Sequence, residues 1–431
     1  MHPVVRVPYS LAGHLARAAA ALSPAGSGKL ISSLRARRGI RDRYAAWAAK
    51  ERDPSRPLIW MHASSVGEGL QAHPVIARLR ERRPDLQVAY TFYSPSAEAF
   101  ARTMDADFAD YLPFDTIGDA DAALASLRPT ALIFSKLDVW PLLVARAVAR
   151  GVPVGMISAT FSAESARASP LAALVLTDAY RALRAVGAVD SLDADRLAAL
   201  GVPRERVTVT GDSRYDQVWV RAGSVDRSGT LLAPFTATRT RPTMVAGSTW
   251  PSDEGPLLEA WKEVRAHIPG ARLIVAPHEP AEAHLAPIER WAEREGFSIA
   301  RLGSAAEGDA DVLLVNRTGV LADLYALADV AYVGGGFHAA GLHSVVEPAA
   351  FGVPVLVGPR FGGSRDAQEL LRRGGGFSAR SAAEIAIRTL ALFSEPGTRA
   401  AAGRRARELV ESGLGAADRS AALVEGLLAR R

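Results

Sequence analysis

A serine and a glutamate stand where the first predicted strand gives way to a helix. An apolar run at 58–63 is followed by Ser64-Ser65-Val66-Gly67-Glu68, which opens a helical pattern. Ser65 and Glu68 have the spacing of a capping box, in which both side chains bond to free amides of the first helical turn. The same position suits a general base, with Gly67 letting a substrate approach the Glu68 carboxylate. The two roles are compatible, and the sequence leaves both open.

Charged residues also follow two later strands of the first half. Lys136 and Asp138 come after the strand expected at 131–134, and Arg214 comes after the strand expected at 207–210. Charged groups at the carboxyl end of a strand are well placed for a ligand, and a cation such as Arg214 could stabilise a phosphate or a leaving group. The structural alternatives are a helix cap at Asp138 with Lys136 merely exposed, and a self-bonded turn before Arg214.

The second half of the chain has small residues and a histidine at three strand ends. These runs are Gly247-Ser248-Thr249, Pro277-His278 and Gly334-Gly335-Gly336. The first precedes a helix and could present amides to a phosphate, and the third permits close approach of the backbone. A helix-opening acid, Glu347, follows within Ser344-Val345-Val346-Glu347, and Gly-Val-Pro-Val comes after it. A glycine-rich loop, then such an acid, then Gly-x-Pro-Val is how two-domain glycosyltransferases hold a nucleotide ribose and phosphate.

Parallel sheets must position these strand ends. Apolar runs stand at 58–63, 88–93, 131–134, 152–158, 185–189 and 207–210, and again at 243–247, 272–276, 312–315, 330–333 and 354–357, with helical patterns between most of them. Continuous apolar strands that alternate with helices predict an α/β protein with parallel sheets covered on both faces. Ligands bind at the carboxyl ends of such strands, so we expect the site in a cleft between the two halves.

Composition and pattern divide the chain into five expected segments. They are a basic amphipathic segment at 1–56, a first Rossmann-like domain at 57–220, a linker at 221–240, a second Rossmann-like domain at 241–392 and a C-terminal helix at 393–431. The linker is rich in Gly, Ser, Thr, Arg and Pro, as connecting segments are. The final helices could pack on either half.

The net charge of +5 is concentrated at the N-terminus. Residues 1–56 hold 11 Lys and Arg against 3 Asp and Glu, which leaves the rest of the chain at −3. This argues against a broad nucleic-acid surface and for a local anionic partner. Residues 4–22 are interrupted by Arg6, His14 and Arg17, so they suit a helix lying on anionic lipid rather than a membrane span. The alternative is a helix packed on the protein's own surface.

Several classes of chemistry are excluded or disfavoured. The chain has no cysteine, which excludes disulfide scaffolds, thiol nucleophiles and iron–sulfur clusters. His278-Glu279 continues to His284 instead of completing H-E-x-x-H, and His338 and His343 are five residues apart, so we expect no metal. The absence of G-x-G-x-x-G after the first strand and of a G-x-S-x-G elbow disfavours oxidoreductases and serine hydrolases.

With these motifs in this order, the sequence resembles the bacterial 3-deoxy-D-manno-octulosonic acid (Kdo) transferases of lipopolysaccharide synthesis. The motifs are Ser65-Val66-Gly67-Glu68, Trp140-Pro141, Thr210-Gly211-Asp212, Gly247-Ser248-Thr249, Pro277-His278 and the block from Gly334 to Glu347-Pro348-Ala349. The resemblance implies a two-domain GT-B fold and inverting transfer of Kdo from CMP-Kdo to a lipid A precursor of the lipid IVA type. It also implies a place at the cytoplasmic face of the bacterial inner membrane.

The resemblance assigns roles to individual residues. Glu68 matches the proton acceptor, Arg214 takes the place of a lysine that stabilises the transition state, and Ser64, Ser65 and Gly67 are expected at the acceptor. The nucleotide-binding residues expected from the motifs and their family counterparts are Gly247, Ser248, Thr249, Pro277, His278, Thr318, Gly319, Val320, Gly334, Gly335, Gly336, Ser344, Val345, Val346 and Glu347. Expected partners are CMP-Kdo, the lipid A precursor and anionic lipid bound through residues 1–43, with no nucleic acid and no metal cofactor.

Some positions depart from the family pattern. Lys136 and Asp138 replace the two glutamates of E-x-E-L-W-P, and Val320 replaces a glutamate of the Met-Gly-Glu loop. Glutamate to lysine changes the local charge by two units at a site for a carboxylated sugar. This predicts an altered donor or acceptor preference, a different number of sugars added, or lower activity. The alternatives are another GT-B nucleotide-sugar enzyme that uses UDP, and a catalytically lapsed, membrane-associated nucleotide-binding homologue.

Overall fold

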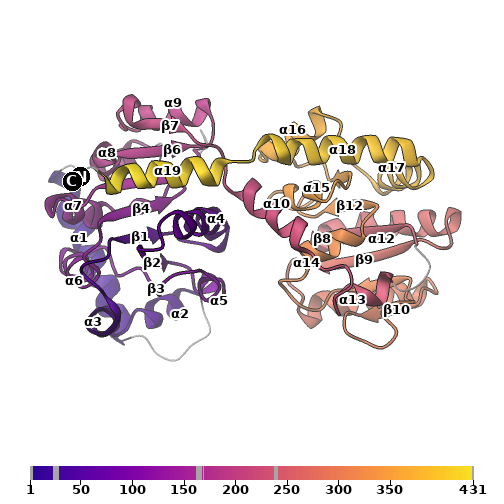
Figure 1. The fold of residues 1–431 in the computed structure, drawn as a ribbon. Helices are drawn as coiled ribbons and strands as arrows, with labels where there is room; N and C mark the ends of the chain where they lie inside the picture. Colours follow the sequence, from indigo (N-terminus) through magenta and orange to yellow (C-terminus); the bar gives the residue numbers. More distant parts are fainter. Residues whose placement is uncertain (1–2, 23–28, 162–166, 168, 237–240, 430–431) are drawn as a thin grey trace. The chain divides into compact units, whose positions relative to one another are not determined.

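The computed structural model describes residues 3–22, 29–161, 167, 169–236 and 241–429. The chain divides into unit 1, which contains Met1–Gln217 and Gly413–Arg431, and unit 2, which contains Val218–Ser412 (Figure 1). Each unit holds one parallel seven-stranded sheet with helices, as the α/β prediction requires. Parts of four expected segments lie outside the described residues: 1–2 and 23–28 of the basic segment, 162–166 and 168 of the first domain, 237–240 of the linker, and 430–431 of the last helix.

The sheet of unit 1 has the order β3-β2-β1-β4-β5-β6-β7. Its strands are β1 (Leu58–His62), β2 (Gln87–Phe92), β3 (Phe108–Tyr111), β4 (Ala131–Ser135), β5 (Val154–Ala159), β6 (Ala185–Ala188) and β7 (Val207–Val209). Every residue of β1, β2, β4 and β5 is buried, because helices cover both faces of these strands. All seven strands are parallel, so their carboxyl ends share one edge of the sheet.

Two layers of helices cover the unit 1 sheet. The helices are α1 (Pro3–Leu22), α2 (Lys29–Ala36), α3 (Ile40–Glu51), α4 (Val66–Arg82), α5 (Glu98–Ala101), α6 (Ile117–Leu127), α7 (Pro141–Ala149), α8 (Pro170–Ala182), α9 (Ser191–Ala199) and α19 (Ala416–Leu428). Helix α3 contacts α6, α6 contacts α7, and α7 contacts α8. Helix α19 packs against α4, β4, β5 and β6. Figure 1 shows α19 as a yellow helix lying along the sheet of unit 1.

The basic N-terminal cluster is largely engaged within unit 1. Arg37 is buried, donates to the Leu112 carbonyl at 2.9 Å and lies over the Tyr93 ring. Arg41 pairs with Asp119, and Arg43 pairs with Asp110. These contacts support the alternative in which this part of the segment packs on its own protein. Within the described residues, no helix is long and apolar enough to cross a membrane.

The sheet of unit 2 has the order β10-β11-β9-β8-β12-β13-β14. Its strands are β8 (Thr243–Thr249), β9 (Arg272–Pro277), β10 (Ile299–Arg301), β11 (Val312–Leu314), β12 (Val330–Val333), β13 (Val355–Val357) and β14 (Gly376–Ser378). Alternate strand residues enter two cores: Met244 and Ala246 pack in one, and Val245 in the other. This alternation is expected for a sheet that is covered on both faces.

The helices of unit 2 complete both of its cores. They are α11 (Ala233–Thr236), α12 (Pro251–His267), α13 (Glu282–Arg294), α14 (Leu321–Leu324), α15 (Val346–Ala350), α16 (Arg365–Arg372), α17 (Ala382–Ser394) and α18 (Pro396–Ser412). The expected linker contains the end of α10 (Arg214–Ser224), and Leu232 and Phe235 are buried in a core of unit 2. The two final helices divide: α18 belongs to unit 2, whereas α19 belongs to unit 1.

Candidate active site

Glu68 lies in the first turn of α4, directly after β1. The Glu68 amide donates to Ser65 Oγ at 3.4 Å, and the Ser64 amide donates to Glu68 Oε2 at 2.6 Å. This is the capping arrangement that the Ser65-x-x-Glu68 spacing predicts, although the carboxylate takes the amide of Ser64. The carboxyl group is half-buried, and the Ser64 bond engages Oε2. Gly67 is exposed, and a side chain there would meet open space.

Lys136 directly follows β4, and its charge acts on Glu68. Its backbone is left-handed, with φ of 68°, which is uncommon for a residue other than glycine. The Lys136 amide donates to the Ile157 carbonyl, and Ser135 Oγ donates to the Glu68 carbonyl at 2.9 Å. These bonds fix the end of β4 against the first turn of α4. A strained backbone held in this way marks a position at which function is worth testing.

Burial and charge act in opposite directions on Glu68. Burial raises the pKa of the Glu68 carboxyl above its ordinary value, and this effect exceeds all others. The positive charge of Lys136, the amides of Ser64 and Ser65, and Arg167 all lower that pKa and oppose the effect of burial. A carboxylate whose pKa is raised toward neutrality is a better proton acceptor near neutral pH than an ordinary glutamate.

Asp138 is paired with a cation of the same unit. Its carboxylate accepts a hydrogen bond from Arg167, and the two form an ion pair. Two residues along, Trp140 stacks on Tyr93 with ring centroids 5.1 Å apart. Asp138 therefore fixes the position of Arg167, whose charge also acts on Glu68.

Arg214 begins α10 and is bonded to its neighbour Asp212. Its Nε and Nη2 donate to Asp212 Oδ2 at 2.9 and 2.6 Å. Burial by itself would raise the pKa of Asp212, but the charge and hydrogen bonds of Arg214 hold it below its ordinary value. The carboxylate is therefore ionised, and it partly neutralises the guanidinium that sequence analysis expected to act on a phosphate.

A buried polar network ties α4 to the loop before Arg214. Gln71, one turn beyond Glu68, donates its amide to Asp212 Oδ1 at 3.1 Å. Ser213 Oγ donates to the Gln71 carbonyl at 2.6 Å and lies 2.8 Å from Ser158 Oγ. Gln71 and Ser158 were not predicted from the sequence as site residues. Gln71 could have been found as a polar residue on the buried face of an amphipathic helix. No feature of the sequence pattern indicated Ser158.

His62 closes β1 beneath these groups. The imidazole is fully buried, and its Nε2 accepts a hydrogen bond from Trp140 Nε1 at 3.2 Å and lies 3.1 Å from Ser64 Oγ. Nδ1 lies 3.0 Å from Thr91 Oγ1. Burial lowers the pKa of His62 to about 3, so the ring is neutral. Ser64, which we expect at the acceptor, is thus held at both its amide and its hydroxyl.

In unit 2, the three predicted runs meet at one edge of the sheet. Gly247 pairs with Val333 in the parallel ladder, and Thr249 pairs with Pro277, so the ends of β8, β9 and β12 are adjacent. The His278 amide donates to the Thr249 carbonyl at 2.9 Å. Ser248 sits at a bulge of β8 with φ of 54°. The sequence motifs therefore form one cluster.

All three glycines are required by packing, Gly335 because a Cβ there would lie 2.1 Å from the Gly341 carbonyl oxygen. A Cβ at Gly334 would lie 2.2 Å from the Ser248 carbonyl oxygen, and one at Gly336 would lie 2.4 Å from the Gly358 nitrogen. Such contacts are closer than real side chains allow. The loop after β12 thus passes directly between two other backbone segments, and glycine is needed there whether or not a ligand binds.

Four rings gather beside this loop. Trp250 stacks on His338 with centroids 4.3 Å apart and planes at 8°, and it packs at a tilt of 33° against His278 with centroids 4.5 Å apart. Trp250 Nε1 donates to His343 Nε2 at 3.1 Å. Burial lowers the pKa of His343, and the neighbouring His278 lowers it further. Of these rings, sequence analysis placed only His278 at the nucleotide. The others stood within or beside the predicted motifs without a role.

The remaining predicted nucleotide residues occupy the same edge of the unit 2 sheet. Thr318 and Gly319 are exposed after β11, and Val320 precedes α14. Ser344 is exposed, and Val345 and Val346 are buried at the start of α15. Glu347 lies near enough to the buried Tyr325 hydroxyl to raise its pKa, after the larger effect of burial. A Cβ at Gly247 would meet that hydroxyl at 2.2 Å, so Gly247, Tyr325 and Glu347 are close together.

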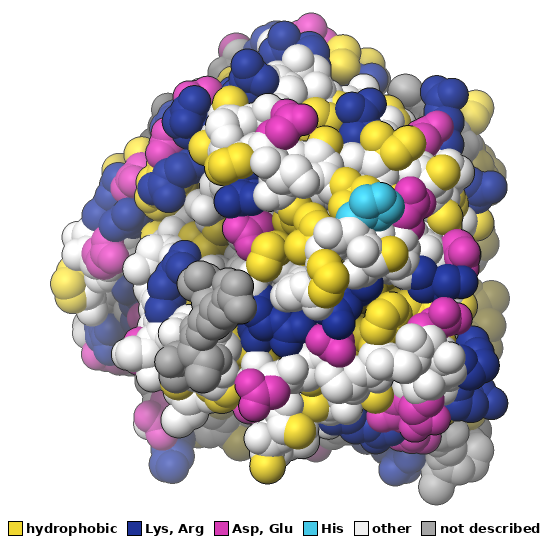
Figure 2. All heavy atoms as spheres, turned by 90° about the vertical axis from the view of Figure 1, so that its right-hand side faces the viewer, with side chains coloured by type: hydrophobic (Ala, Val, Ile, Leu, Met, Phe, Trp, Pro, Cys, Tyr) yellow, Lys and Arg dark blue, Asp and Glu magenta, His cyan; other side chains and the backbone are white. Residues whose placement is uncertain are grey.

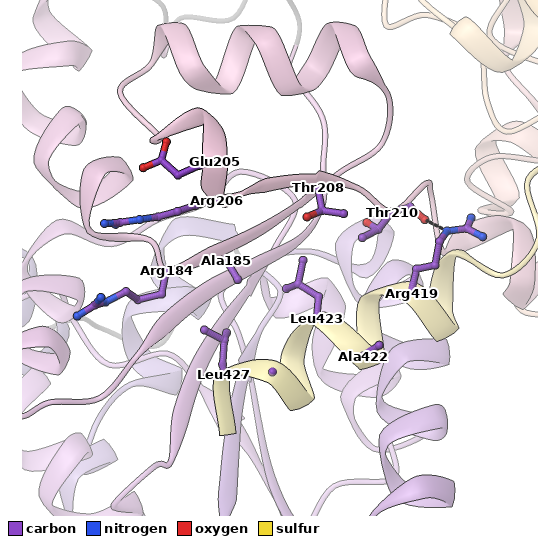
Figure 3. A pocket seen from close by; sticks show the side chains of 11 residues that line it. Arg184, Ala185, Glu205, Arg206, Thr208, Thr210, Arg419, Ala422, Leu423 and Leu427 are labelled. Carbon is purple, nitrogen blue, oxygen red and sulfur yellow. Dashed lines mark hydrogen bonds between the residues drawn. The ribbon is translucent and has the colours of Figure 1, made fainter. Parts of the chain in front are cut away.

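A groove of about 670 Å³ lies elsewhere in unit 1, between β6, β7 and α19 (Figure 3). Arg184, Glu205 and Arg206 line it, together with Leu423 and Leu427 of α19. None of the site residues predicted from sequence lines this groove, so it is separate from the candidate site. Over the described part of the chain, no cluster of three His, Asp or Glu side chains is arranged to hold a metal ion.

Comparison with known proteins decides the family. Residues 34–217 match the family described as 3-deoxy-D-manno-octulosonic-acid transferase (kdotransferase). A Bordetella pertussis protein named 3-deoxy-D-manno-octulosonic acid transferase is 30% identical over 397 residues, covering 90% of this chain and 91% of the relative. The chain belongs to this family. It is therefore a glycosyltransferase, as the motif order predicted.

Other comparisons agree with this assignment. A Haemophilus influenzae protein of the same name is 26% identical over 337 residues, which cover 76% of each chain. The solved structure of UDP-GlcNAc 2-epimerase from Neisseria meningitidis bound to UDP-GlcNAc has a TM-score of 0.59 at 14% identity, covering 87% of this transferase and 100% of that chain. This likeness and the two parallel sheets confirm the predicted GT-B type of α/β fold.

Proposed function

We propose that this transferase moves Kdo from CMP-Kdo to a hydroxyl group of a lipid A precursor of the lipid IVA type, with inversion at the anomeric carbon. Family membership supports Kdo as the sugar transferred. The observation that carries the mechanism is the half-buried carboxylate of Glu68, whose pKa burial raises and whose Oε2 is fixed by the Ser64 amide. Such a group is oriented and poised to accept a proton.

The reaction is a single displacement. The acceptor hydroxyl oxygen forms a bond to the anomeric carbon while the bond from that carbon to the CMP phosphate oxygen breaks. The hydroxyl proton passes to the Glu68 carboxylate, and CMP leaves with the bonding electron pair. Attack opposite the leaving group inverts the configuration. Lys136, whose charge acts on Glu68, is placed to favour the ionised form of the base.

The proposal assigns acceptor chemistry to unit 1 and donor binding to unit 2. Ser64, Ser65 and Gly67 surround Glu68, and Arg214 adds a guanidinium for the phosphate charge. The ends of β8, β9 and β12, with Glu347, supply a compact edge for the nucleotide. We propose that no metal takes part, since arginine and lysine side chains can neutralise a departing phosphate.

The partners follow from the same assignment. We propose CMP-Kdo as the donor, and we propose that nucleic acid is not a partner. On the face shown in Figure 2, Lys and Arg side chains are interspersed with acidic and apolar ones. A nucleic-acid surface gathers basic groups instead.

We further propose that α1 rests on the cytoplasmic face of the inner membrane. Val4, Val7, Leu11 and Leu15 recur at helical spacing and are 73%, 74%, 57% and 62% exposed. The other face of the helix is anchored, since the Tyr9 hydroxyl donates to Asp115 at 2.7 Å. An exposed apolar stripe on an anchored helix suits an interfacial contact with lipid. Because Arg37, Arg41 and Arg43 are engaged in unit 1, the apolar stripe carries this proposal.

The test is a mass-spectrometric product assay with CMP-Kdo and a tetraacyl lipid A precursor. Glu68→Gln keeps the size of the side chain but removes its ability to accept a proton, so product formation should fall at least about 100-fold. Glu384→Gln is the matched control. Glu384 caps α17 as Glu68 caps α4, with Ser381 Oγ taking the Glu384 amide at 3.3 Å and Glu384 taking the Arg380 amide at 2.9 Å. Replacing the Glu384 carboxylate should weaken the cap of α17 but leave product formation unchanged.

The same assay separates the alternatives. Equal activity in both variants would remove Glu68 from the reaction. Titration of CMP and UDP against the wild-type protein distinguishes a CMP-Kdo enzyme from a UDP-sugar enzyme of similar fold. Tight CMP binding with no product from any Kdo acceptor would indicate the lapsed nucleotide-binding homologue that the lysine at position 136 suggests.

A further inference from the structure

A buried carboxylate lies under the glycine-rich loop of unit 2. Asp253 is fully buried in the first turn of α12. Its Oδ2 accepts from the amides of Trp250 at 3.0 Å and Gly335 at 2.8 Å, and its Oδ1 accepts from the Phe337 amide at 2.9 Å. The Tyr332 hydroxyl approaches Oδ1 at 3.4 Å. Three hydrogen bonds from backbone amides thus satisfy the oxygens of a buried acid that would be costly to bury without partners.

These bonds join two elements that are far apart in the sequence. The Trp250 amide belongs to the start of α12, whereas Gly335 and Phe337 belong to the loop after β12. The loop has little freedom, since Gly335 has φ of 93° and a Cβ there would lie 2.1 Å from the Gly341 carbonyl oxygen. Asp253 therefore fixes the position of this loop relative to Trp250.

The ring cluster depends on that spacing. Asp253 holds the backbone of Trp250 and the backbone of Phe337, which directly precedes His338. The parallel stack of Trp250 on His338 and the bond from Trp250 to His343 both require these segments to stay in register. His343 Nε2 accepts from the indole and His338 Nδ1 accepts from the Ala340 amide, which leaves His343 Nδ1 and His338 Nε2 as the nitrogens able to donate.

The same bonds show which groups do not face a ligand. The amides of Gly335 and Phe337 point to Asp253, so they cannot cradle a phosphate as amides of a glycine-rich loop often do. Pro251, the next residue of α12, has no amide hydrogen to offer. At the start of α12, Asp253 also accepts the Trp250 amide. The ring N–H groups of His338 and His343 are the donors that the loop instead brings to this edge.

We propose that Asp253 is a positioning residue of the nucleotide site: it assembles the Trp250, His338 and His343 rings by fixing the loop after β12 to the start of α12. The inference rests on the proposed function for the identity of the ligand, a cytidine nucleotide, while the ring arrangement itself exists without ligand.

The test uses the full-length protein with Asp253→Asn and a matched control, Asp193→Asn. Asp193 is also a fully buried acid in the first turn of a helix, and it accepts a loop amide, that of Phe161, at 2.8 Å, but it belongs to unit 1. The first readout is the NMR signals of the His338 and His343 ring C–H groups in ligand-free protein, with the exposed His267 as reference. The second is the dissociation constant for CMP.

Asp253→Asn should shift the His338 and His343 signals toward the His267 position, because an amide offers one acceptor oxygen where the carboxylate offers two. It should weaken CMP binding about tenfold or more, the equivalent of about one hydrogen bond. Asp193→Asn should change neither. Unchanged ring signals in folded Asp253→Asn would overturn the inference, and so would an equal change in both variants.

Hydrogen exchange in the wild-type protein gives a test that requires no variant. The Gly335 and Phe337 amides should exchange as slowly as the amides of β12, and fast exchange at both would overturn the inference. If the wild-type protein does not bind CMP but the ring signals respond to Asp253→Asn as expected, the nucleotide assignment fails, whereas the positioning role of Asp253 stands.

Discussion

The chemistry of Glu68 depends on two opposing effects at one carboxyl group. Burial favours the protonated acid, while Lys136, Arg167 and the amides of Ser64 and Ser65 favour the carboxylate. A base must be ionised before it can accept a proton, yet a strongly stabilised carboxylate is a weak base. Under the proposed mechanism, Lys136 therefore adjusts the pKa of Glu68 and does not itself take the proton. A single substitution of Lys136 removes its positive charge and so removes one of the effects that lower the pKa of Glu68.

Lys136→Met should move the acid limb of the pH–rate profile upward. In the wild-type enzyme, kcat/KM for transfer should fall as the pH drops through the pKa of Glu68, which lies above the ordinary 4.5. Removing the positive charge raises that pKa further, so the limb should move to higher pH. Lys50→Met, which removes an exposed lysine elsewhere, is the control. A limb that stays in place would show that Lys136 does not act on the base.

His62 should make the fold sensitive to acid. Its pKa is about 3 in the folded protein against an ordinary 6.5, so the unfolded chain binds more protons between these values. Its stabilising effect is complete above pH 6.5 and is lost as the pH falls toward 3, at a slope approaching 1.4 kcal/mol per pH unit. Urea unfolding at several pH values should show a smaller slope in His62→Gln than in wild type. The exposed His267→Gln should keep the wild-type slope.

At the scale of elements, the central strands were predictable because they are buried on both faces. The apolar runs at 88–93 and 131–134 correspond to β2 and β4 within a residue or two. Strands β3, β10 and β14 were missed. They lie toward the edges of their sheets, have three or four residues, and include exposed or half-buried positions, so no continuous apolar run marks them.

The candidate site was predictable where local spacing determines the structure. The capping arrangement of Glu68 follows from Ser65-x-x-Glu68, and the order of the glycine-rich runs located the unit 2 edge. Asp253 and Gln71 could not be found in this way. Their partners, Gly335 and Asp212, are separated from them by 82 and 141 positions, and only the folded sheet brings them together. Likewise, nothing local showed that Arg37 would be buried.

Helix α1 offers a test of membrane contact that leaves the fold intact. Val7→Ser with Leu11→Ser removes apolar side chains that are 74% and 57% exposed, so the free energy of unfolding should change little. Binding to vesicles of phosphatidylethanolamine and phosphatidylglycerol should weaken about tenfold or more, since each side chain buried in lipid contributes on the order of 1.5–3 kcal/mol. Flotation of the protein with the vesicles measures this.

The control for α1 replaces apolar residues of similar exposure in unit 2. Val220→Ser with Ile387→Ser changes side chains that are 61% and 62% exposed. This variant should bind vesicles as the wild type does. Equal loss of vesicle binding in both double variants would show that any added polar surface residues weaken binding. No loss of vesicle binding in either would place the membrane contact elsewhere on the protein.

At the scale of the whole molecule, the chain leaves unit 1 in α10 and returns to it for its last helix. Asp216 accepts the amides of Gly415 and Ala417 at 2.7 and 2.9 Å, which caps α19 with a residue about 200 positions earlier. Ala421, Val424 and Leu427 then complete the core of unit 1. The fold of unit 1 therefore needs helix α19, whereas unit 2 is continuous in sequence.

Two leucines near the C-terminus should consequently stabilise different units. Leu427 of α19 and Leu409 of α18 are each 4% exposed, but Leu427 packs in unit 1 and Leu409 lies in unit 2. Leu427→Ala should destabilise unit 1 by about 2–5 kcal/mol, which hydrogen-exchange mass spectrometry would detect as faster exchange in β4 and β5. Leu409→Ala should speed exchange in β12 and β13 instead. Leu427→Ala removes apolar contacts from the core of unit 1. Faster exchange in unit 2 alone would therefore contradict the assignment of α19 to unit 1.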